Sequence, residues 1–169
     1  KIKVGNKSIT VFGNHWPSQN NPSTARMEAS KILIEKAKES DSNVIIATGD
    51  FNTLETEVPN AINNLNNEFI DVHYQAKLRV FKNLWPGTHW YKGHWGSLDK
   101  MFVLKRFYGA TLKFRSFNIL PYKYLLGNKE LTDIDTGETT TFKNIPQRFN
   151  IGSGKGYSDH LPIVFAVNL

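Results

Sequence analysis

Four short polar segments of this sequence combine residue types that can carry out phosphate chemistry. They read Asn-His-Trp-Pro-Ser at residues 14–18, Gly-Asp-Phe-Asn at 49–52, Leu-Asp at 98–99 and Ser-Asp-His at 158–160. Carboxylates bind hard cations, and imidazoles carry protons or contact phosphate oxygens. Each segment adjoins an apolar run typical of a strand, so we expect their side chains to meet at one edge of a sheet.

The Gly-Asp-Phe-Asn segment is the most specific of the four. Asp50 and Asn52 are two residues apart, so on an extended backbone they face one side while Phe51 points into the core. A carboxylate next to an amide suits the orientation of a water molecule that attacks a phosphate. Gly49 would let the backbone pass close to a ligand. The alternative interpretation is an Asx-turn that simply ends the strand.

Asp159 and His160 stand side by side between a glycine-rich turn and an apolar strand. Asp159 offers an oxygen to Mg²⁺, which usually takes only one or two protein carboxylates. Asp99 would fix the tautomer of His160 and stabilise its imidazolium if the two met in space; by itself it reads as a turn residue. His15 could donate to a phosphate oxygen, although a histidine that fills a strand end is an equal alternative.

The composition indicates one packed domain with a basic surface. Of 169 residues, 40% are hydrophobic and 12% aromatic, which argues against disorder. The net charge of +6 favours anionic partners such as nucleic acid or phosphorylated lipid. The absence of cysteine excludes disulfides and zinc–thiolate sites. Apolar runs are shorter than the roughly 18 residues of a membrane helix, so we expect no membrane span.

The order of predicted elements is that of an α/β or α+β fold. We expect strands near residues 9–12, 44–47, 98–104, 111–117 and 161–167, a helix from Ser23 or Thr24 to about Glu39, and a weaker helix after Pro59. The wholly apolar run at 44–47 is typical of a strand buried on both faces. Residues 121–147 read as an insertion with a hairpin around Asp135, Thr136 and Gly137.

In this order and at these gaps, the four segments resemble those of the endonuclease/exonuclease/phosphatase superfamily, which includes deoxyribonuclease-like and exonuclease III-like enzymes. The resemblance covers most of the chain and is weakest over residues 122–150. It implies half of a four-layer α/β/β/α sandwich, mainly one mixed sheet with helices on its outer face. Residues 87–99 are also similar to a bacterial branch of secreted or periplasmic members, which favours a periplasmic or secreted location.

The resemblance implies metal-dependent hydrolysis of a phosphodiester or phosphomonoester by direct attack of water, with a nuclease-like enzyme favoured. His15 would contact the scissile phosphate. Asp50 would orient or deprotonate the attacking water. Asn52 would hold a phosphate oxygen.

The remaining residues of the implied site surround these three. Asp99 would orient His160, which would stabilise developing charge or protonate the leaving oxygen. Asp159 would bind Mg²⁺, or Mn²⁺ or Ca²⁺ in its place, with Asp50 and Asn52 as further metal ligands. Substrate contacts are assigned to Trp16 and Lys100.

The family's first half, with a Gln-Glu motif whose Glu is the main metal ligand, has no counterpart in residues 1–12. We therefore expect residues 1–169 to form the C-terminal half of the family domain, with the N-terminal half absent from this chain. Because the two family sheets bury their inner faces on each other, a lone half would expose apolar residues near 9–11, 44–46 and 163–165. We expect the missing half or a second copy to cover this face, and the fragment alone to be inactive.

A second hypothesis is a non-catalytic, basic module that binds nucleic acid on the same fold. Aromatic residues interleave with lysines at 81–82 and 90–92, as in proteins that stack nucleobases. Ordinary core or loop packing explains such aromatics more often. The basic charge favours nucleic acid among phosphate esters, but the choice of substrate depends on loops that no motif decodes.

Overall fold

The computed structural model describes residues 1–79, 84–107 and 116–167 of the chain. Within these ranges the α-helices are α1 (Ser23–Glu39), α2 (Ala61–Leu65) and α3 (Val72–Arg79). The strands are β1 (Ile2–Val4), β2 (Lys7–His15), β3 (Val44–Asp50), β4 (Phe69–Asp71), β5 (His89–Tyr91), β6 (His94–Gly96), β7 (Asp99–Leu104), β8 (Asn118–Ile119), β9 (Leu126–Thr132), β10 (Thr139–Pro146) and β11 (Ile163–Val164). Among the described helices, none is both long and apolar enough to cross a membrane.

A mixed five-stranded sheet in the order β1-β2-β3-β7-β4 forms the centre of the fold. β2 and β3 are parallel, and the other neighbouring strands of this sheet are antiparallel. The chain returns from β2 to β3 through α1, because parallel neighbours need a crossover connection. β3 lies in the middle of the sheet, which explains its apolar sequence: Val44, Ile45 and Ala47 are all buried.

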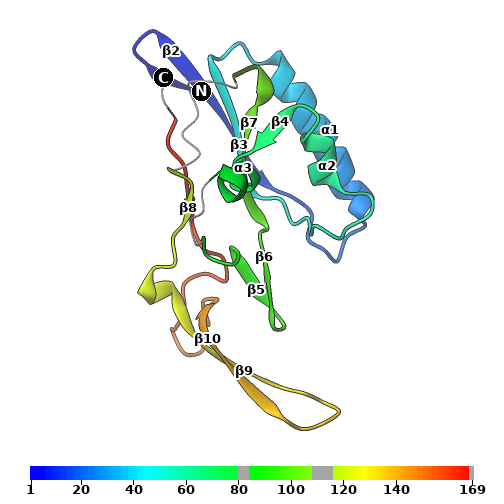
Figure 1. Cartoon of the computed structure of the whole chain (residues 1–169), viewed down its shortest axis with the longest axis vertical. Coiled ribbons are helices and arrows are strands. Elements are labelled where there is room, and N and C mark those ends of the chain that lie inside the picture. Colours follow the sequence, from blue (N-terminus) through cyan, green and yellow to red (C-terminus); the bar gives the residue numbers. More distant parts are fainter. Residues whose placement is uncertain (80–83, 108–115, 168–169) are drawn as a thin grey trace.

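Each face of the sheet has its own apolar cluster. On one face, Leu33 of α1 and Leu65 of α2 pack with Phe51 and Phe102. Phe51 meets Trp16 and Phe102 edge-on, with ring centroids 4.7 and 5.0 Å away. α3 and the paired strands β8 and β11 pack on the opposite face. Figure 1 shows α1 and α2 on one side of the sheet and β8 on the other.

This arrangement confirms the predicted α/β (α+β) class, with one mixed sheet and helices α1 and α2 on one of its faces. No side chain caps α1, because the N-cap residue is Pro22, and Oγ of Ser23 in the first turn donates to the carbonyl oxygen of Val58. The strand predicted at 161–167 is only Ile163–Val164, and it pairs with β8 rather than with the central sheet. The strand predicted at 111–117 lies almost wholly outside the described residues.

The hairpin predicted within residues 121–147 is formed by strands β9 and β10. Asp133 closes its turn by accepting hydrogen bonds from the backbone N–H groups of Asp135 and Thr136. Gly137 follows with a φ of 73°, a conformation that glycine adopts without strain. The hairpin extends away from the central sheet (Figure 1), and Phe142 of β10 packs against Trp90 of β5 with ring centroids 5.1 Å apart.

The sheet face opposite α1 and α2 is only partly covered. Ile2, Val4 and Val11 are 54%, 49% and 42% exposed. They lie on this face because Ile2 pairs with Ile9 and Val11 pairs with Ile46, and both partners pack in the second apolar cluster. We call these three exposed side chains the open face. The prediction expected exposed apolar residues near 9–11, 44–46 and 163–165. The structure instead buries Val44 and Ile45 and packs Ile163 and Phe165 against the second cluster, while β1 supplies Ile2 and Val4.

Candidate active site

Three of the predicted residues form a row across the sheet. The parallel register of β2 and β3 places His15 opposite Asp50, and the antiparallel register of β3 and β7 places Asp50 opposite Asp99. Opposed residues on neighbouring strands project to the same face, so the three side chains lie on the face away from α1. The Nε2 atom of His15 is 3.9 Å from Oδ2 of Asp50.

Asp99 holds the ring of His160. The Nδ1 atom of His160 lies 2.7 Å from Oδ2 of Asp99, and the backbone N–H of His160 donates to Oγ of Ser158 at 3.0 Å. Thr88 fixes both segments. Its Oγ1 accepts from the N–H of Asp99 at 3.1 Å, and its carbonyl oxygen accepts from the N–H of Leu161 at 2.7 Å. The structure therefore brings Asp99 and His160 together as a hydrogen-bonded pair.

The adjacent imidazoles of His160 and His89 have opposite pKa shifts. Burial lowers the pKa of His160, but the hydrogen bond and charge of Asp99, with the charges of Asp50 and Asp159, raise it above its ordinary value. Burial lowers the pKa of His89, and the charge of His160 lowers it further. Their ring centroids are 4.7 Å apart. The site thus favours a cationic His160 beside a neutral His89.

Asn52 is held against the carboxylate of Asp50. Its backbone N–H donates to Oδ1 of Asp50 at 2.8 Å, and its Nδ2 donates to Oδ2 at 3.1 Å and to the carbonyl oxygen of Trp16 at 3.0 Å. This is an Asx-turn with a φ of 47° at Asn52, not the extended backbone that was predicted. Both hydrogens of the Asn52 amide are used within the chain, so its remaining polar atom is the acceptor Oδ1.

Gly49 serves the packing of two strands. Its φ is 128°, and a Cβ atom at this position would lie 2.0 Å from the backbone oxygen of Asn14 on β2. Backbone cannot move aside as a flexible side chain can, so only glycine fits here. The packing of β2 against β3 is therefore sufficient to explain Gly49, and a close approach of the chain to a ligand at this residue stays a prediction.

A groove of about 920 Å³ runs past these residues. Its lining includes all six residues predicted for catalysis and metal binding, which are His15, Asp50, Asn52, Asp99, Asp159 and His160. The loop after β2 contributes Ser18, Gln19 and Asn20, and the β5–β6 hairpin contributes His89, Tyr91, Lys92 and His94. Four segments that are distant in the sequence therefore meet in one groove.

The groove contains side chains that fit a divalent metal ion. Single ligand atoms of His89, Asp159 and His160 lie within 4.8 Å of one another. The carboxylates and amide oxygen of Asp50 and Asn52 line the same groove. Oxygen donors suit Mg²⁺, and a mixed set of imidazole and carboxylate suits Mn²⁺ or Zn²⁺. Asp159 already has one cationic neighbour, since Nε of Arg148 is 3.0 Å from its Oδ2.

His89 and Arg148 line the groove, although the sequence analysis did not single them out. His89 belongs to the Gly-Thr-His-Trp segment at 87–90, which indicated only a similarity to a bacterial branch of the family and no role for this histidine. Its place beside the site is fixed by a backbone bridge to His160. Arg148 follows β10 in the region of weakest resemblance, and no motif in the sequence points to it.

Trp16 and Lys100 lie away from the groove, which corrects their predicted substrate contacts. Trp16 is 5% exposed and packs edge-on against Phe51. Lys100 is also 5% exposed, because the alternation of β7 turns it to the opposite face from Asp99. Its Nζ is 3.7 Å from Oδ2 of Asp71. The aromatic–lysine pair noted at 81–82 lies outside the described residues.

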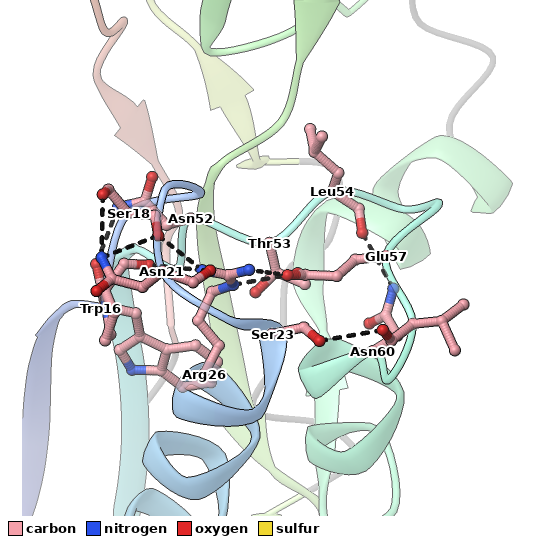
Figure 2. A network of polar contacts seen from close by, with 12 residues as sticks. Trp16, Ser18, Asn21, Ser23, Arg26, Asn52, Thr53, Leu54, Glu57 and Asn60 are labelled. Carbon is pink, nitrogen blue, oxygen red and sulfur yellow. Dashed lines mark hydrogen bonds and ion pairs between the residues drawn. The ribbon is translucent and has the colours of Figure 1, made fainter.

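A buried arginine connects the loops that follow β2 and β3 (Figure 2). Arg26 of α1 is 3% exposed, and its Nη1 donates to the carbonyl oxygens of Pro17 and Ser18 at 3.0 and 2.8 Å. Its Nε is 3.2 Å from Oε2 of Glu57, and its Nη2 contacts Oε1 of the same carboxylate. Because Ser18 lines the groove, Arg26 helps to position one side of it from within the core.

The geometry agrees with the comparison of the chain with known families. The sequence model of the Endonuclease/Exonuclease/phosphatase family matches residues 1–169, and the chain belongs to this family. No curated protein matches the chain.

Solved structures share the fold at low sequence identity. An endonuclease/exonuclease/phosphatase family protein from Bacteroides thetaiotaomicron is 17% identical with a TM-score of 0.50, and the match covers 93% of this chain and 47% of that protein. A humanized TDP2 of D. rerio is 16% identical with a TM-score of 0.50, covering 99% and 55%. A mannosyl-6-phosphatase from B. thetaiotaomicron is 15% identical with a TM-score of 0.46, covering 94% and 51%. The chain spans about half the length of these proteins.

Proposed function

We propose that the chain provides the catalytic side chains of a metal-dependent phosphoesterase that hydrolyses phosphodiester or phosphomonoester bonds. Membership of the family supports a phosphoesterase in general. One observation supports the more specific proposal that these side chains catalyse metal-dependent hydrolysis. His15, Asp50 and Asp99 stand in a row along one groove, with His160 bonded to Asp99. Direct attack of water on phosphate needs an aligned base, a phosphate contact and a proton donor. The row offers a side chain for each task.

Asp50 is the residue that orients or deprotonates the attacking water. Asn52 is a positioning residue, because its two hydrogen bonds hold both carboxylate oxygens of Asp50 in one orientation. The role first expected for Asn52, donation to a phosphate oxygen, conflicts with the use of both amide hydrogens within the chain. His15 is 81% exposed at its side chain and is the phosphate contact on the other side of Asp50.

His160 acts on the charge that develops at the phosphate or on the leaving oxygen. Its Nδ1 is occupied by Asp99, which leaves Nε2 as the ring nitrogen available to a substrate. Burial lowers the pKa of His160, but the hydrogen bond and charge of Asp99 raise it above its ordinary value, which favours the protonated ring. Asp99 is therefore a positioning residue that acts through His160.

A divalent metal ion would be held by Asp159, together with His89 or with the oxygens of Asp50 and Asn52. When bound, it supplies Lewis-acid stabilisation of the negative charge on the phosphate. Arg148 holds one oxygen of Asp159 and leaves the other for the ion.

We also propose that the open face is covered by the half of the family domain that the chain does not span. Two observations support this. The chain spans about half of the solved structures that share its fold, and Ile2, Val4 and Val11 present apolar surface to solvent. Apolar patches of this kind mark interaction surfaces.

Hydrolysis assays test the enzymatic proposal. The substrates are bis-p-nitrophenyl phosphate and p-nitrophenyl phosphate, with Mg²⁺, Mn²⁺ or chelator, for the chain alone and for the chain within its natural protein. For the chain within its natural protein, we expect turnover that needs a divalent cation and is lost in Asp50→Ala and His160→Ala. Full rates in both variants would show that the assignment is wrong. Strong binding of polyanions without turnover would favour the non-catalytic binding module instead.

A further inference from the structure

A second hollow adjoins the groove. It has a volume of about 700 Å³ and lies between strand β5, the base of the β9–β10 hairpin and the loop that follows β10. It shares His89, Tyr91, Arg148 and Asp159 with the groove. A substrate bound at the groove can therefore extend into the hollow without leaving the protein surface.

The hollow is rich in positive charge. Its lining includes Lys129, Arg148 and Lys155, while Asp159 is the one carboxylate among its described lining residues. Lys129 is held in place, since its Nζ lies 5.2 Å from the centre of the Trp90 ring. An anion that enters the hollow thus meets three cations, one from β9 and two from the loop that follows β10.

Exposed tyrosine rings stand beside these cations. Tyr91 and Tyr124 line the hollow and are 60% and 61% exposed. Tyr122 stacks on Tyr124 with ring centroids 5.5 Å apart and an angle of 8°, and Tyr157 meets Tyr124 edge-on at 5.5 Å. These contacts hold the Tyr124 ring in place, although water still covers more than half of the residue. Tyrosines of this kind offer flat apolar faces for stacking.

We propose that the hollow is a subsite for single-stranded nucleic acid, which binds the nucleotides next to the phosphate held in the groove. Bases stack on Tyr124 and Tyr91, and the backbone phosphates contact Lys129, Arg148 and Lys155. Aromatic faces alone would also suit sugars, but aromatic faces interleaved with cations match a chain that alternates bases and phosphates. This proposal depends on the proposed phosphoesterase function in one respect only, which is that the subsite lies next to the phosphate to be cleaved.

Fluorescence anisotropy tests the subsite without catalysis. The probe is a labelled oligothymidylate of about 10 nucleotides, within the range bound by single-strand binding folds, measured with chelator present so that it is not cleaved. An abasic oligonucleotide of the same length keeps the charge and lacks the bases. We expect oligothymidylate to bind more tightly than the abasic strand, and Tyr124→Ala to weaken its binding by about tenfold while abasic binding changes little. Lys155→Gln should weaken both and reduce the salt dependence of binding.

Tyr74→Ala is the matched control, because Tyr74 is 58% exposed on α3 and lines neither the hollow nor the groove. It should bind both strands as the wild type does. Melting curves of each variant separate loss of binding from loss of folding.

Three results would overturn the subsite. Folded Tyr124→Ala could bind oligothymidylate as the wild type does, or the wild type could bind both strands equally. Glucose 6-phosphate could displace the probe as well as thymidine monophosphate does, which would indicate a sugar-phosphate site. Hydrolysis of bis-p-nitrophenyl phosphate would persist in each case if only the subsite is wrong. If the chain within its natural protein failed to hydrolyse this substrate while oligonucleotide binding stayed normal, the proposed phosphoesterase would be contradicted instead.

Discussion

Asp99 and His160 are 61 residues apart in the chain, and their side chains meet at 2.7 Å between Oδ2 and Nδ1. Asp99 belongs to the central sheet, whereas His160 lies in the loop before β11. The hydrogen bond therefore joins β7, which carries one end of the row of His15, Asp50 and Asp99, to the layer on the opposite face from α1. Against the effect of burial, the same hydrogen bond raises the pKa of His160.

Asp99→Asn should shift the pH dependence of hydrolysis. Asp99 raises the pKa of His160 against the effect of burial, so a protonated ring is retained to higher pH and activity is lost as the pH rises through this raised pKa. Without the carboxylate, the alkaline limb of the rate profile should move to lower pH. Rates measured across pH check this, and an unchanged limb in a folded variant would contradict it. Asp135→Asn, in the distant hairpin turn, is the control.

Protonated His160 should also contribute to folding stability. Its folded-state pKa lies above the ordinary value of 6.5, so the contribution is complete below about pH 6.5 and disappears as the pH rises through the folded-state pKa. Asp99→Asn should therefore lower the free energy of unfolding mainly at pH values below the folded-state pKa of His160. Urea unfolding at several pH values measures the difference, and an equal loss at every pH would indicate a role unrelated to the proton.

Asp50→Ala should reduce kcat by about 10² to 10⁴ with a smaller change in KM, since general bases contribute in this range. Asn52→Ala should show part of this loss, because it removes the side-chain hydrogen bond to Oδ2 of Asp50 and keeps only the backbone N–H bond to Oδ1. If Asn52→Ala instead raised only KM, Asn52 would bind substrate directly. Measurement of kcat and KM on bis-p-nitrophenyl phosphate separates the two roles.

Arg26→Met should destabilise the fold by about 3–5 kcal/mol, because it leaves the half-buried carboxylate of Glu57 without its partner. The loop at residues 17–21 also loses the donors that fix it (Figure 2), so activity should fall in the protein that remains folded. The double variant Arg26→Met/Glu57→Leu should recover much of the stability and little of the activity. Lys31→Met on the exposed side of the same helix serves as control. Full activity in the double variant would rule out the positioning role.

His73 should make the protein sensitive to acid. Its ring is buried against Phe117 with centroids 4.9 Å apart, and burial followed by the charges of Lys77 and Lys100 lowers its pKa from 6.5 to about 3. The unfolded chain takes up this proton below about pH 6.5 and the folded chain does not, so stability falls between pH 6.5 and 3 by up to about 1.4 kcal/mol per pH unit. His73→Phe keeps the stacking and should flatten this part of the curve. An equally steep fall in the variant would assign the acid sensitivity to other groups.

The open face should bind apolar dyes or drive self-association when the chain is studied alone. Ile2, Val4 and Val11 lie together on one side of β1 and β2, and Val11→Thr should reduce both signals. Light scattering and dye fluorescence measure them. If the chain were a monodisperse monomer at high concentration and did not bind apolar dyes, the open face would be stable in contact with water.

The sequence by itself determined much of the local structure. The apolar run at 44–47 predicted a buried strand, the spacing after Ser23 predicted α1, and the residues around Asp135 predicted the hairpin turn. These features depend on neighbouring residues, so periodicity and turn chemistry reveal them. The four polar segments also pointed to the groove, because polar residues at strand ends share an edge.

The tertiary structure decided what depends on register and on contacts between distant segments. The alternation of β7 turned Lys100 into the core while Asp99 faces the groove, and the approach of β2 gave Gly49 a packing role that the sequence did not indicate. His89 and Arg148 reach the groove only because the β5–β6 hairpin and the loop after β10 pack beside His160. One-dimensional patterns do not encode which distant backbone lies next to which side chain, and the folded chain sets that by burying its two apolar clusters.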